Sequence, residues 1–273
     1  MNKLYLIIPL FYFLFACNSP QTFRMQKATA QEKRAILKSD SIPNAARKLM
    51  EAYPDFVIGY RSNCIIWKDS TRMLFSDFKN PKSFSDLLNK PSLSDQFIFK
   101  YQKGKLPFNP KKNYDPGRIR YEPFFYKMYG TSQNAVRKKL VEINWCPKLG
   151  GQKIMITTIN GIDKKVKAIS DELDKHPELK KYVTNIGGTF NWRKVNGTER
   201  QSAHSFGMTI DINTRYSNYW QWECHCTNED ANIVYENKIP QLIVDIFEKN
   251  GFIWGGKWYH FDTMHFEYRP ELL

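Results

Sequence analysis

The most constraining feature of this chain is a carboxylate inside an apolar strand. The segment SAHSFGMTIDIN alternates so that Ile210 and Ile212 fall on one face of the predicted strand and Asp211 falls on the other. A charged group between two isoleucines is costly to bury unless it has a partner. Gly207 permits a turn that brings His204 back alongside the strand. The pattern therefore indicates a partner of opposite charge for Asp211, and a metal ion is a good one.

A second polar group follows near the C-terminus, in WGGKWYHFDTMHFEYRPEL. His265 can supply a third ligand beside His204 and Asp211, and a catalytic zinc ion needs three protein ligands and an open position for water. Asp262 is close enough to lie beside the metal without binding it. A zinc peptidase needs such a carboxylate to take a proton from water and return it to the leaving amine. The alternatives are a hydrogen-bonded histidine near a strand aspartate, and a helix cap or turn role for Asp262.

These two segments resemble the motifs of a known peptidase family. SAHSFGMTIDI is similar to the S-x-H-x-x-G-x-x-x-D motif of the D-alanyl-D-alanine metallopeptidases, and WGGKWYHFDTMHFE is similar to their closing G-G-x-W and [ED]-x-x-H motif. The resemblance covers roughly residues 145–270. It implies a small α+β zinc fold shared with hedgehog signalling domains. It also implies Zn²⁺ held by His204, Asp211 and His265, with Asp262 as general base.

The resemblance further implies a role for Arg193 in FNWR, which corresponds to an arginine that polarises the scissile carbonyl or holds a substrate carboxylate. A guanidinium suits either role because it is a fixed fork of donors. The alternative for Arg193 is a surface ion pair. His260 stays open between orienting the substrate and forming part of a wall.

The reaction implied is hydrolysis of peptides of the peptidoglycan stem. Many D-alanyl-D-alanine carboxypeptidases have Glu where this chain has Asp262, and the Asp form resembles the branch that includes L-alanyl-D-glutamate endopeptidases. Both activities therefore stay open. The alternative from another class is a non-catalytic zinc-containing cell-wall-binding module, which has no need of a base at Asp262.

The N-terminus has the proportions of an export signal. The apolar run from Leu4 to Phe15 is shorter than the roughly 20 residues that span a bilayer. LFAC resembles the lipobox of bacterial lipoproteins, which implies cleavage before Cys17 and a lipid on its sulfur. An ordinary secretory signal is the alternative. We expect an exported, membrane-anchored protein facing the periplasm or cell envelope. Its predicted parts are a lipoprotein signal peptide (1–16), a tether (17–40), an N-terminal extension or subdomain (41–144) and the zinc peptidase catalytic domain (145–273).

The formal net charge of +14 raises the question of a polyanionic partner. The lysines and arginines are scattered, and no nucleic-acid-binding motif is present, so we expect no nucleic-acid partner. The charge suits a solvated surface in an anionic cell wall. The oligomeric state is left open. Export makes disulfides plausible, and three connectivities are open for Cys64, Cys146, Cys224 and Cys226. The CHC spacing at 224–226 matches no zinc pattern.

Hydrophobic periodicity predicts mixed helices and strands without regular βαβ units, which favours the α+β class. Helices are expected at residues 42–54, 132–145, 163–176 and 239–251. Strands are expected at 153–160, 207–213 and 264–269, with a hairpin formed by 56–67 and 72–78. The Pro- and Tyr-rich region between residues 89 and 130 is expected to be largely irregular.

Overall fold

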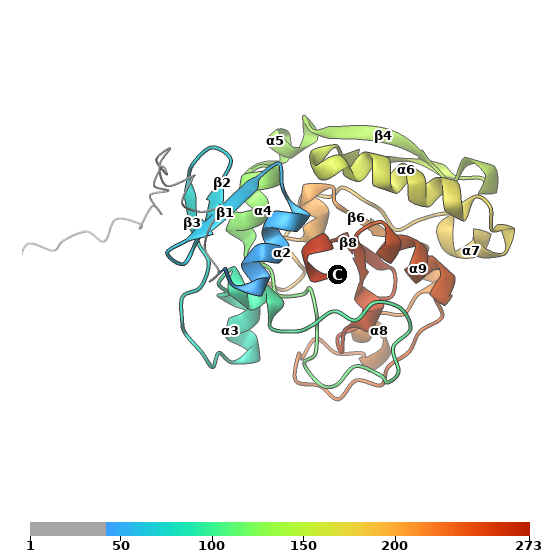
Figure 1. Ribbon diagram of the computed structural model, residues 1–273. Helices are drawn as coiled ribbons and strands as arrows, with labels where there is room; N and C mark the ends of the chain where they lie inside the picture. The colour runs from blue at the N-terminus through green and yellow to red at the C-terminus, as the bar shows by residue number, and fades with distance from the viewer. Residues whose placement is uncertain (1–41) are drawn as a thin grey trace, which may run out of the picture.

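The structure is a computed structural model that describes residues 42–273 (Figure 1). It contains mixed helices and three small antiparallel sheets, which confirms the α+β class. The predicted signal peptide, the lipobox cysteine Cys17 and the whole of the tether lie outside the described residues. No helix within the described part of the chain is long and apolar enough to cross a membrane.

The described chain contains strands, α-helices and 3-10 helices. The strands are β1 Val57–Arg61, β2 Cys64–Trp67, β3 Arg72–Leu74, β4 Leu140–Trp145, β5 Gln152–Thr157, β6 Thr209–Asp211, β7 Phe252–Trp254 and β8 His265–Tyr268. The α-helices are α2 Asn44–Ala52, α3 Phe84–Asn89, α4 Glu122–Tyr129, α5 Gln133–Arg137, α6 Ile162–Leu173, α7 Lys180–Val183, α8 Trp220–Cys224 and α9 Gln241–Lys249. Three of the 3-10 helices matter for the site: η5 Ala203–Phe206, η7 Gly255–Lys257 and η8 Pro270–Leu272.

The sheets have the orders β1-β2-β3, β4-β5 and β6-β8-β7. Helix α6 packs against β4, β5 and α9, and α9 packs in turn against β7. Figure 1 shows α2 and the β1-β2-β3 sheet on one side of the molecule, with the C-terminus beside α2. In the β6-β8 ladder, Asp211 lies opposite His265. The central sheet therefore places the two predicted motifs directly side by side.

One buried core contains side chains from both sides of residue 145. Phe125 of α4 stacks on Phe206 of η5, with ring centres 5.9 Å apart. The apolar face predicted for residues 163–176 is present, because Val166, Ile169 and Leu173 are fully buried. The boundary expected between extension and catalytic domain stays a prediction, and the packing across it is continuous.

The helix predicted for residues 132–145 is wrong over its second half. Helix α5 ends at Arg137, and the following residues form β4, which pairs along its whole length with β5. Here pairing with the next strand outweighed a local helical spacing of apolar residues. The strand predicted for 56–67 is also divided, because Ser62 and Asn63 adopt positive φ and form a tight turn between β1 and β2.

Helix α4 was not predicted. Its sequence is rich in aromatic residues, which favour strands, and both Phe124 and Phe125 are fully buried. Pro123 occupies the first turn, where its missing N–H costs little. Burial among the neighbouring aromatic rings therefore determines this helix more than its intrinsic propensity does.

The segment between α3 and α4 crosses from the extension to the C-terminal region. The Lys112 ammonium donates to the carbonyl oxygen of Asp230 at 2.7 Å, and the Tyr259 N–H donates to the carbonyl oxygen of Tyr114 at 3.1 Å. Lys257 is buried, pairs with Glu248 and also donates to backbone carbonyls of this segment. The extension is therefore held against the C-terminal region by buried as well as exposed polar contacts.

Helix α9 offers a direct test of the core. The Phe247 ring is fully buried and stacks on Phe266 at 3.9 Å between ring centres, whereas Leu242 on the same helix is 39% exposed. We expect Phe247→Ala to lower the free energy of unfolding by about 3–5 kcal/mol, because a large cavity is left. The control Leu242→Ala should change it by no more than about 0.5 kcal/mol. Urea denaturation of both variants makes the comparison, and equal losses would contradict the assignment of the buried face.

Candidate active site

Three side chains from separate elements meet at one end of the β6-β8 ladder. His204 lies in η5, Asp211 is the last residue of β6 and His265 is the first residue of β8. Gly207 ends η5 with a φ of +65° and turns the chain into β6, a conformation that glycine adopts without strain. The ligand atoms that these side chains offer all lie within 4.8 Å of one another. The structure therefore brings together the three residues predicted to bind a metal.

Each histidine presents one ring nitrogen to Asp211 and holds the other in an outer contact. His204 Nε2 lies 3.0 Å from Asp211 Oδ2, and its Nδ1 lies 2.6 Å from the carbonyl oxygen of Thr189. His265 Nδ1 lies 2.9 Å from Asp211 Oδ1, and its Nε2 lies 3.4 Å from Glu267 Oε2. Outer contacts of this kind fix which nitrogen of a ligating histidine carries the proton. The two inner nitrogens and the carboxylate oxygens therefore face one another, as the ligand atoms of a metal site do.

The charges around this group stabilise positive charge between the side chains. Burial alone would raise the pKa of Asp211, but His204 and His265 lower that pKa well below its usual range. Burial would lower the pKa of His265, but its contacts with Asp211 and Glu267 outweigh burial and raise the pKa to about 10. The carboxylates of Asp211 and Glu267 therefore favour positive charge at this position.

Glu267 supports this group from behind. It is fully buried, and its Oε2 accepts a hydrogen bond from Arg120 at 2.9 Å while its Oε1 accepts one from Arg269 at 3.1 Å. Burial would raise the pKa of Glu267, but Arg120, His265 and Arg269 together lower it to about 2. Glu267 is therefore ionised at neutral pH and can orient the imidazole of His265.

Asp262 lies beside the three predicted ligands without joining them. Its Oδ1 is buried and has no hydrogen-bond partner among residues 42–273. Burial, followed by the nearby Asp211 carboxylate, raises the pKa of Asp262 to about 6. Gly255 of η7 lets the backbone come close, since a Cβ at this position would lie 2.5 Å from the carbonyl oxygen of Asp262. The site therefore contains a buried carboxylate oxygen of Asp262 that accepts no hydrogen bond from the described residues.

A cavity of about 330 Å³ opens beside these residues, and its wall contains all five site residues predicted from the sequence: Arg193, His204, Asp211, Asp262 and His265. The side chain of Arg193 is exposed, and its Nη1 donates to the carbonyl oxygen of Lys194 at 3.2 Å. The backbone N–H of Arg193 donates to Ser205 Oγ, which ties this segment to η5. Arg193 therefore has a fixed backbone and a guanidinium within reach of the cavity.

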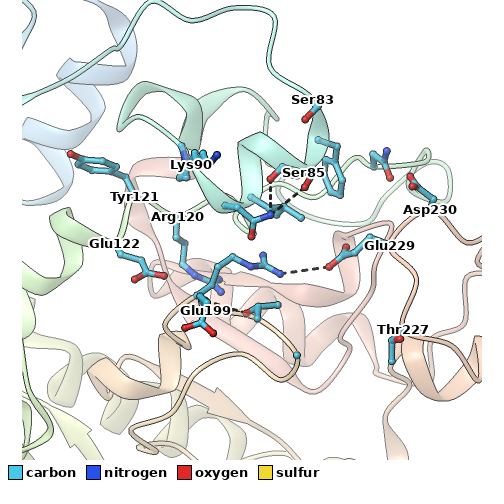
Figure 2. A pocket seen from close by; sticks show the side chains of 18 of the residues that line it. Ser83, Ser85, Lys90, Arg120, Tyr121, Glu122, Glu199, Thr227, Glu229 and Asp230 are labelled. Atoms are coloured by element: carbon cyan, nitrogen blue, oxygen red, sulfur yellow. Dashed lines mark hydrogen bonds and ion pairs between the residues drawn. The ribbon is translucent and has the colours of Figure 1, made fainter. Parts of the chain in front are cut away.

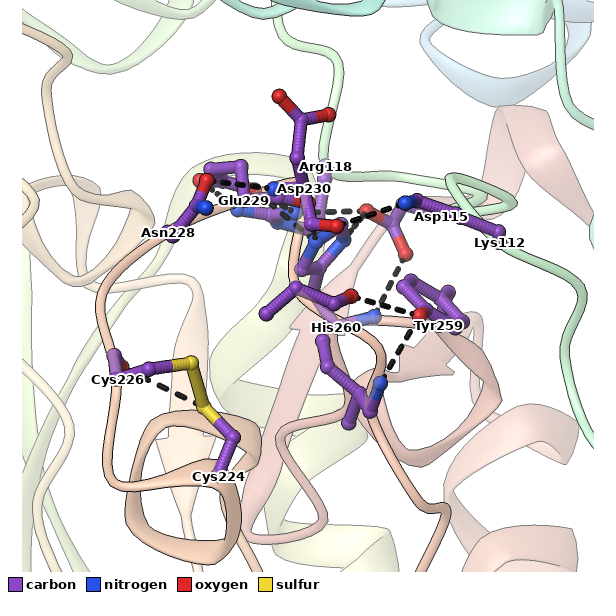
Figure 3. A network of polar contacts seen from close by, with 12 residues as sticks. Lys112, Asp115, Arg118, Cys224, Cys226, Asn228, Glu229, Asp230, Tyr259 and His260 are labelled. Carbon is purple, nitrogen blue, oxygen red and sulfur yellow. Dashed lines mark hydrogen bonds and ion pairs between the residues drawn. A yellow bond between two sulfur atoms is a disulfide. The ribbon is translucent and has the colours of Figure 1, made fainter.

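His260 is held by contacts on both ring nitrogens (Figure 3). Its Nδ1 lies 2.6 Å from Asp115 Oδ2, and its Nε2 lies 2.8 Å from the carbonyl oxygen of Glu229. The ring is fully buried and is stacked on Phe84 with 5.6 Å between ring centres. These contacts join the extension to the segment after α8, so the geometry favours a wall residue over a residue that orients the substrate.

Two of the four cysteines in the described part of the chain form a disulfide. Cys224 is bonded to Cys226, with their Cα atoms 5.2 Å apart, and Cys64 and Cys146 are free thiols. The disulfide joins the two cysteines of the CHC segment, whose spacing matches no zinc pattern. Burial is the main reason that the pKa of Cys146 rises to about 12. That thiol is therefore neutral at physiological pH.

No sequence motif pointed to three arginines in the cavity wall, Arg118, Arg120 and Arg200. The first two belong to the irregular segment before α4, which has no periodicity and no motif. The role of Glu267 could have been inferred, because it is two residues after His265 in a strand and so points to the same face. The arginines could be identified only from the folded structure, in which the extension packs against the C-terminal region.

Comparison with known proteins bears on the C-terminal region. Residues 196–268 match the model of a protein family described as D-alanyl-D-alanine carboxypeptidase. The matched segment contains His204, Asp211, Asp262 and His265 and confirms the family resemblance predicted from the two motifs. It indicates a peptidase related to enzymes of cell-wall peptides. No curated protein matches the chain, and no solved structure does.

The buried contact between Glu267 and His265 can be tested through metal affinity. Glu267→Gln keeps the size of the side chain but removes the charge that orients His265, and we expect the affinity for Zn²⁺ to fall about 10–100-fold. The control is Glu142→Gln on β4, an exposed carboxylate paired with Lys153. Competition with a chromogenic chelator measures the affinity, and circular dichroism checks that both variants are folded. Unchanged affinity in folded Glu267→Gln would show that the outer contact is dispensable.

Proposed function

We propose that this chain is a zinc-dependent peptidase that hydrolyses peptide bonds in the stem peptides of peptidoglycan. The observation that carries the proposal is the arrangement of His204, Asp211 and His265 within 4.8 Å of one another, with the unpartnered carboxylate oxygen of Asp262 in the same cavity wall. The match of residues 196–268 to the D-alanyl-D-alanine carboxypeptidase family supports the substrate class.

The donor set fits Zn²⁺. Two imidazoles and one carboxylate are ligands that zinc prefers, and three protein ligands leave a position for a reactant. The outer contacts of His204 with the Thr189 carbonyl and of His265 with Glu267 are those of ligating histidines. Calcium and magnesium sites use six or more oxygen ligands, and this group of two histidines and one aspartate does not provide them.

Bound zinc would acidify water and polarise the scissile carbonyl. The side chains of the chain supply the remaining steps. Asp262 accepts the proton of the attacking water as the new C–O bond forms, and returns it to the leaving nitrogen as the C–N bond breaks. Arg193, in the wall of the same cavity, can donate hydrogen bonds to the scissile carbonyl or to a substrate carboxylate. Water supplies both the oxygen and the proton that the products gain.

A non-catalytic wall-binding module is the competing function. Such a module would need the metal group but no buried, unpartnered carboxylate beside it, and leaving Asp262 in that state is unfavourable for folding. The cost is understandable if Asp262 exchanges protons during a reaction. We therefore favour an enzyme. Mass spectrometry of purified muropeptides digested by the protein distinguishes carboxypeptidase from endopeptidase products.

Substitution of Asp262 separates catalysis from metal binding. Asp262→Asn is nearly isosteric and removes the proton acceptor, so we expect normal zinc content and a loss of about 10²–10⁴-fold in kcat. Asp245→Asn on the exposed side of α9 is the control and should be fully active. Zinc content and single-turnover cleavage of muropeptides are measured on both proteins. Loss of zinc from Asp262→Asn would make Asp262 a ligand, and wild-type cleavage rates would remove it from the mechanism.

We further propose that the protein is an exported lipoprotein, on the strength of the apolar run that ends at Cys17. Cys17→Ser removes the sulfur that would carry the lipid. We expect the variant to leave the membrane fraction or to keep its unprocessed signal peptide. Membrane fractionation and intact mass measure this, with Cys64→Ser as the control. The same mass and partitioning in Cys17→Ser and wild type would contradict lipid attachment.

A further inference from the structure

A second and larger cavity adjoins the candidate active site. It has a volume of about 1100 Å³ and lies between α3, the start of α4, the turn at residues 197–200 and the segment 227–230 (Figure 2). Arg120 and Arg200 line both this cavity and the smaller one that contains the predicted metal ligands. A ligand could therefore extend from the predicted metal ligands past these two arginines into the larger cavity.

The junction of the two cavities is crowded with guanidinium groups. Arg118 is well neutralised, because it pairs with Asp115 at 2.7 Å and with both oxygens of Glu229. Arg120 is engaged with Glu267 behind the metal group. Arg118 and Arg120 thus have close acidic partners, and their ion pairs stabilise the fold.

Arg200 is the exception. Its nearest acidic contact is Glu229 Oε1 at 3.6 Å, and that carboxylate already accepts two hydrogen bonds from Arg118. Arg200 Nε is buried and has no hydrogen-bond partner within the described chain. Burial, then repulsion from Arg118 and Arg120, lowers the pKa of Arg200 to about 10. The positive charge of the Arg200 guanidinium is therefore only partly neutralised by its surroundings.

The backbone around Arg200 is well fixed. The Val195 N–H donates to the Arg200 carbonyl oxygen at 2.8 Å, and the Arg200 N–H donates to Thr198 Oγ1 at 3.2 Å. The next residue, Gln201, receives support from the extension, because its N–H donates to Glu122 Oε1 at 2.6 Å. A donor held in place before a ligand arrives loses little conformational entropy on binding.

We propose that Arg200 is a subsite for a carboxylate of the substrate, and that the substrate is an acidic peptide that runs from the metal group into the larger cavity. This subsite rests on the proposed peptidase function and adds to it. A guanidinium with an unused donor matches a carboxylate in charge and in planar geometry. The walls that complete the cavity come largely from the extension, which would therefore contribute to the choice of substrate.

The charge of the larger cavity favours one carboxylate over a polyanion. Three cationic side chains line it, and four acidic side chains line it as well: Lys90, Arg120, Arg200, Glu122, Glu199, Glu229 and Asp230 (Figure 2). A chain of phosphates would meet this excess of acids with strong repulsion. A peptide with a single carboxylate at the Arg200 end avoids that repulsion.

The subsite can be tested by binding, without turnover. The probes are L-Ala-D-Glu-L-Lys-D-Ala-D-Ala and two versions of it, one with D-isoglutamine in place of D-glutamate and one with a C-terminal amide. Each version lacks one carboxylate. We measure their affinities by calorimetry for zinc-loaded Asp262→Asn protein, alone and combined with Arg200→Gln, Arg200→Lys or Lys90→Gln. Lys90 is an exposed cation in the same cavity and serves as the control.

One of the two amidated peptides should bind about 10–100-fold more weakly than the parent, the range expected for a hydrogen bond to a charged group. Arg200→Gln should abolish that difference, Arg200→Lys should keep part of it, and Lys90→Gln should keep it in full. Thermal unfolding of each variant identifies any loss of fold, and the Lys variant keeps the test valid if the Gln variant unfolds.

Two results would overturn the subsite: equal binding of all three peptides, or a carboxylate preference that persists unchanged in Arg200→Gln. The proposed function fails separately. If the protein with Asp262 intact cleaves no muropeptide while the Arg200-dependent preference is observed, the subsite stands and the peptidase does not. If cleavage occurs with no dependence on Arg200, the peptidase stands and the subsite is rejected.

Discussion

The buried carboxylate of Glu267 is the group on which the arrangement around the candidate metal site depends. A carboxylate enclosed by protein is stable only when its oxygens have charged or hydrogen-bonding partners. Glu267 has three: His265, Arg120 and Arg269. Because Glu267 holds the outer nitrogen of His265, the inner nitrogen is turned toward Asp211 on the neighbouring strand. Pairing of β6 with β8 sets the distance between His265 and Asp211, and the Glu267 charge sets the orientation of the His265 ring.

The same group explains why the extension is an integral part of the fold. Arg269 also pairs with Glu271, which accepts a hydrogen bond at 2.6 Å from Tyr53, the residue that follows α2. Arg120 comes from the segment before α4. Both ends of this chain of buried polar contacts are therefore residues of the extension, although its centre supports His265, a predicted metal ligand in the C-terminal region. Without the extension, Glu267 and Glu271 would each lose a partner, and buried acids left with fewer partners destabilise a fold strongly.

The sequence predicted those parts of the structure that depend on local pattern. Periodicity predicted the apolar face of α6, and the resemblance of two motifs to a peptidase family implied five site residues that line one cavity. The whole of β4 and of α4 was missed, because pairing with β5 determines the first and burial among aromatic rings determines the second. The pairing of Cys224 with Cys226 was one of several open choices. Arg118, Arg120 and Arg200 could not have been found, since only the folded chain brings them together.

The crowding of those arginines is a feature that folding alone does not favour. Repulsion among Arg118, Arg120 and Arg200 is offset by Glu229 and Glu267, and the offset is incomplete at Arg200. Proteins commonly retain such unfavourable charges where a ligand is bound, because a ligand of opposite charge recovers the lost stability as affinity. A carboxylate at this junction would relieve the repulsion while leaving the pairs of Arg118 and Arg120 intact. The extension would then have two effects on one reaction: it holds a metal ligand in orientation from behind, and it sets the charge that the substrate must present in front.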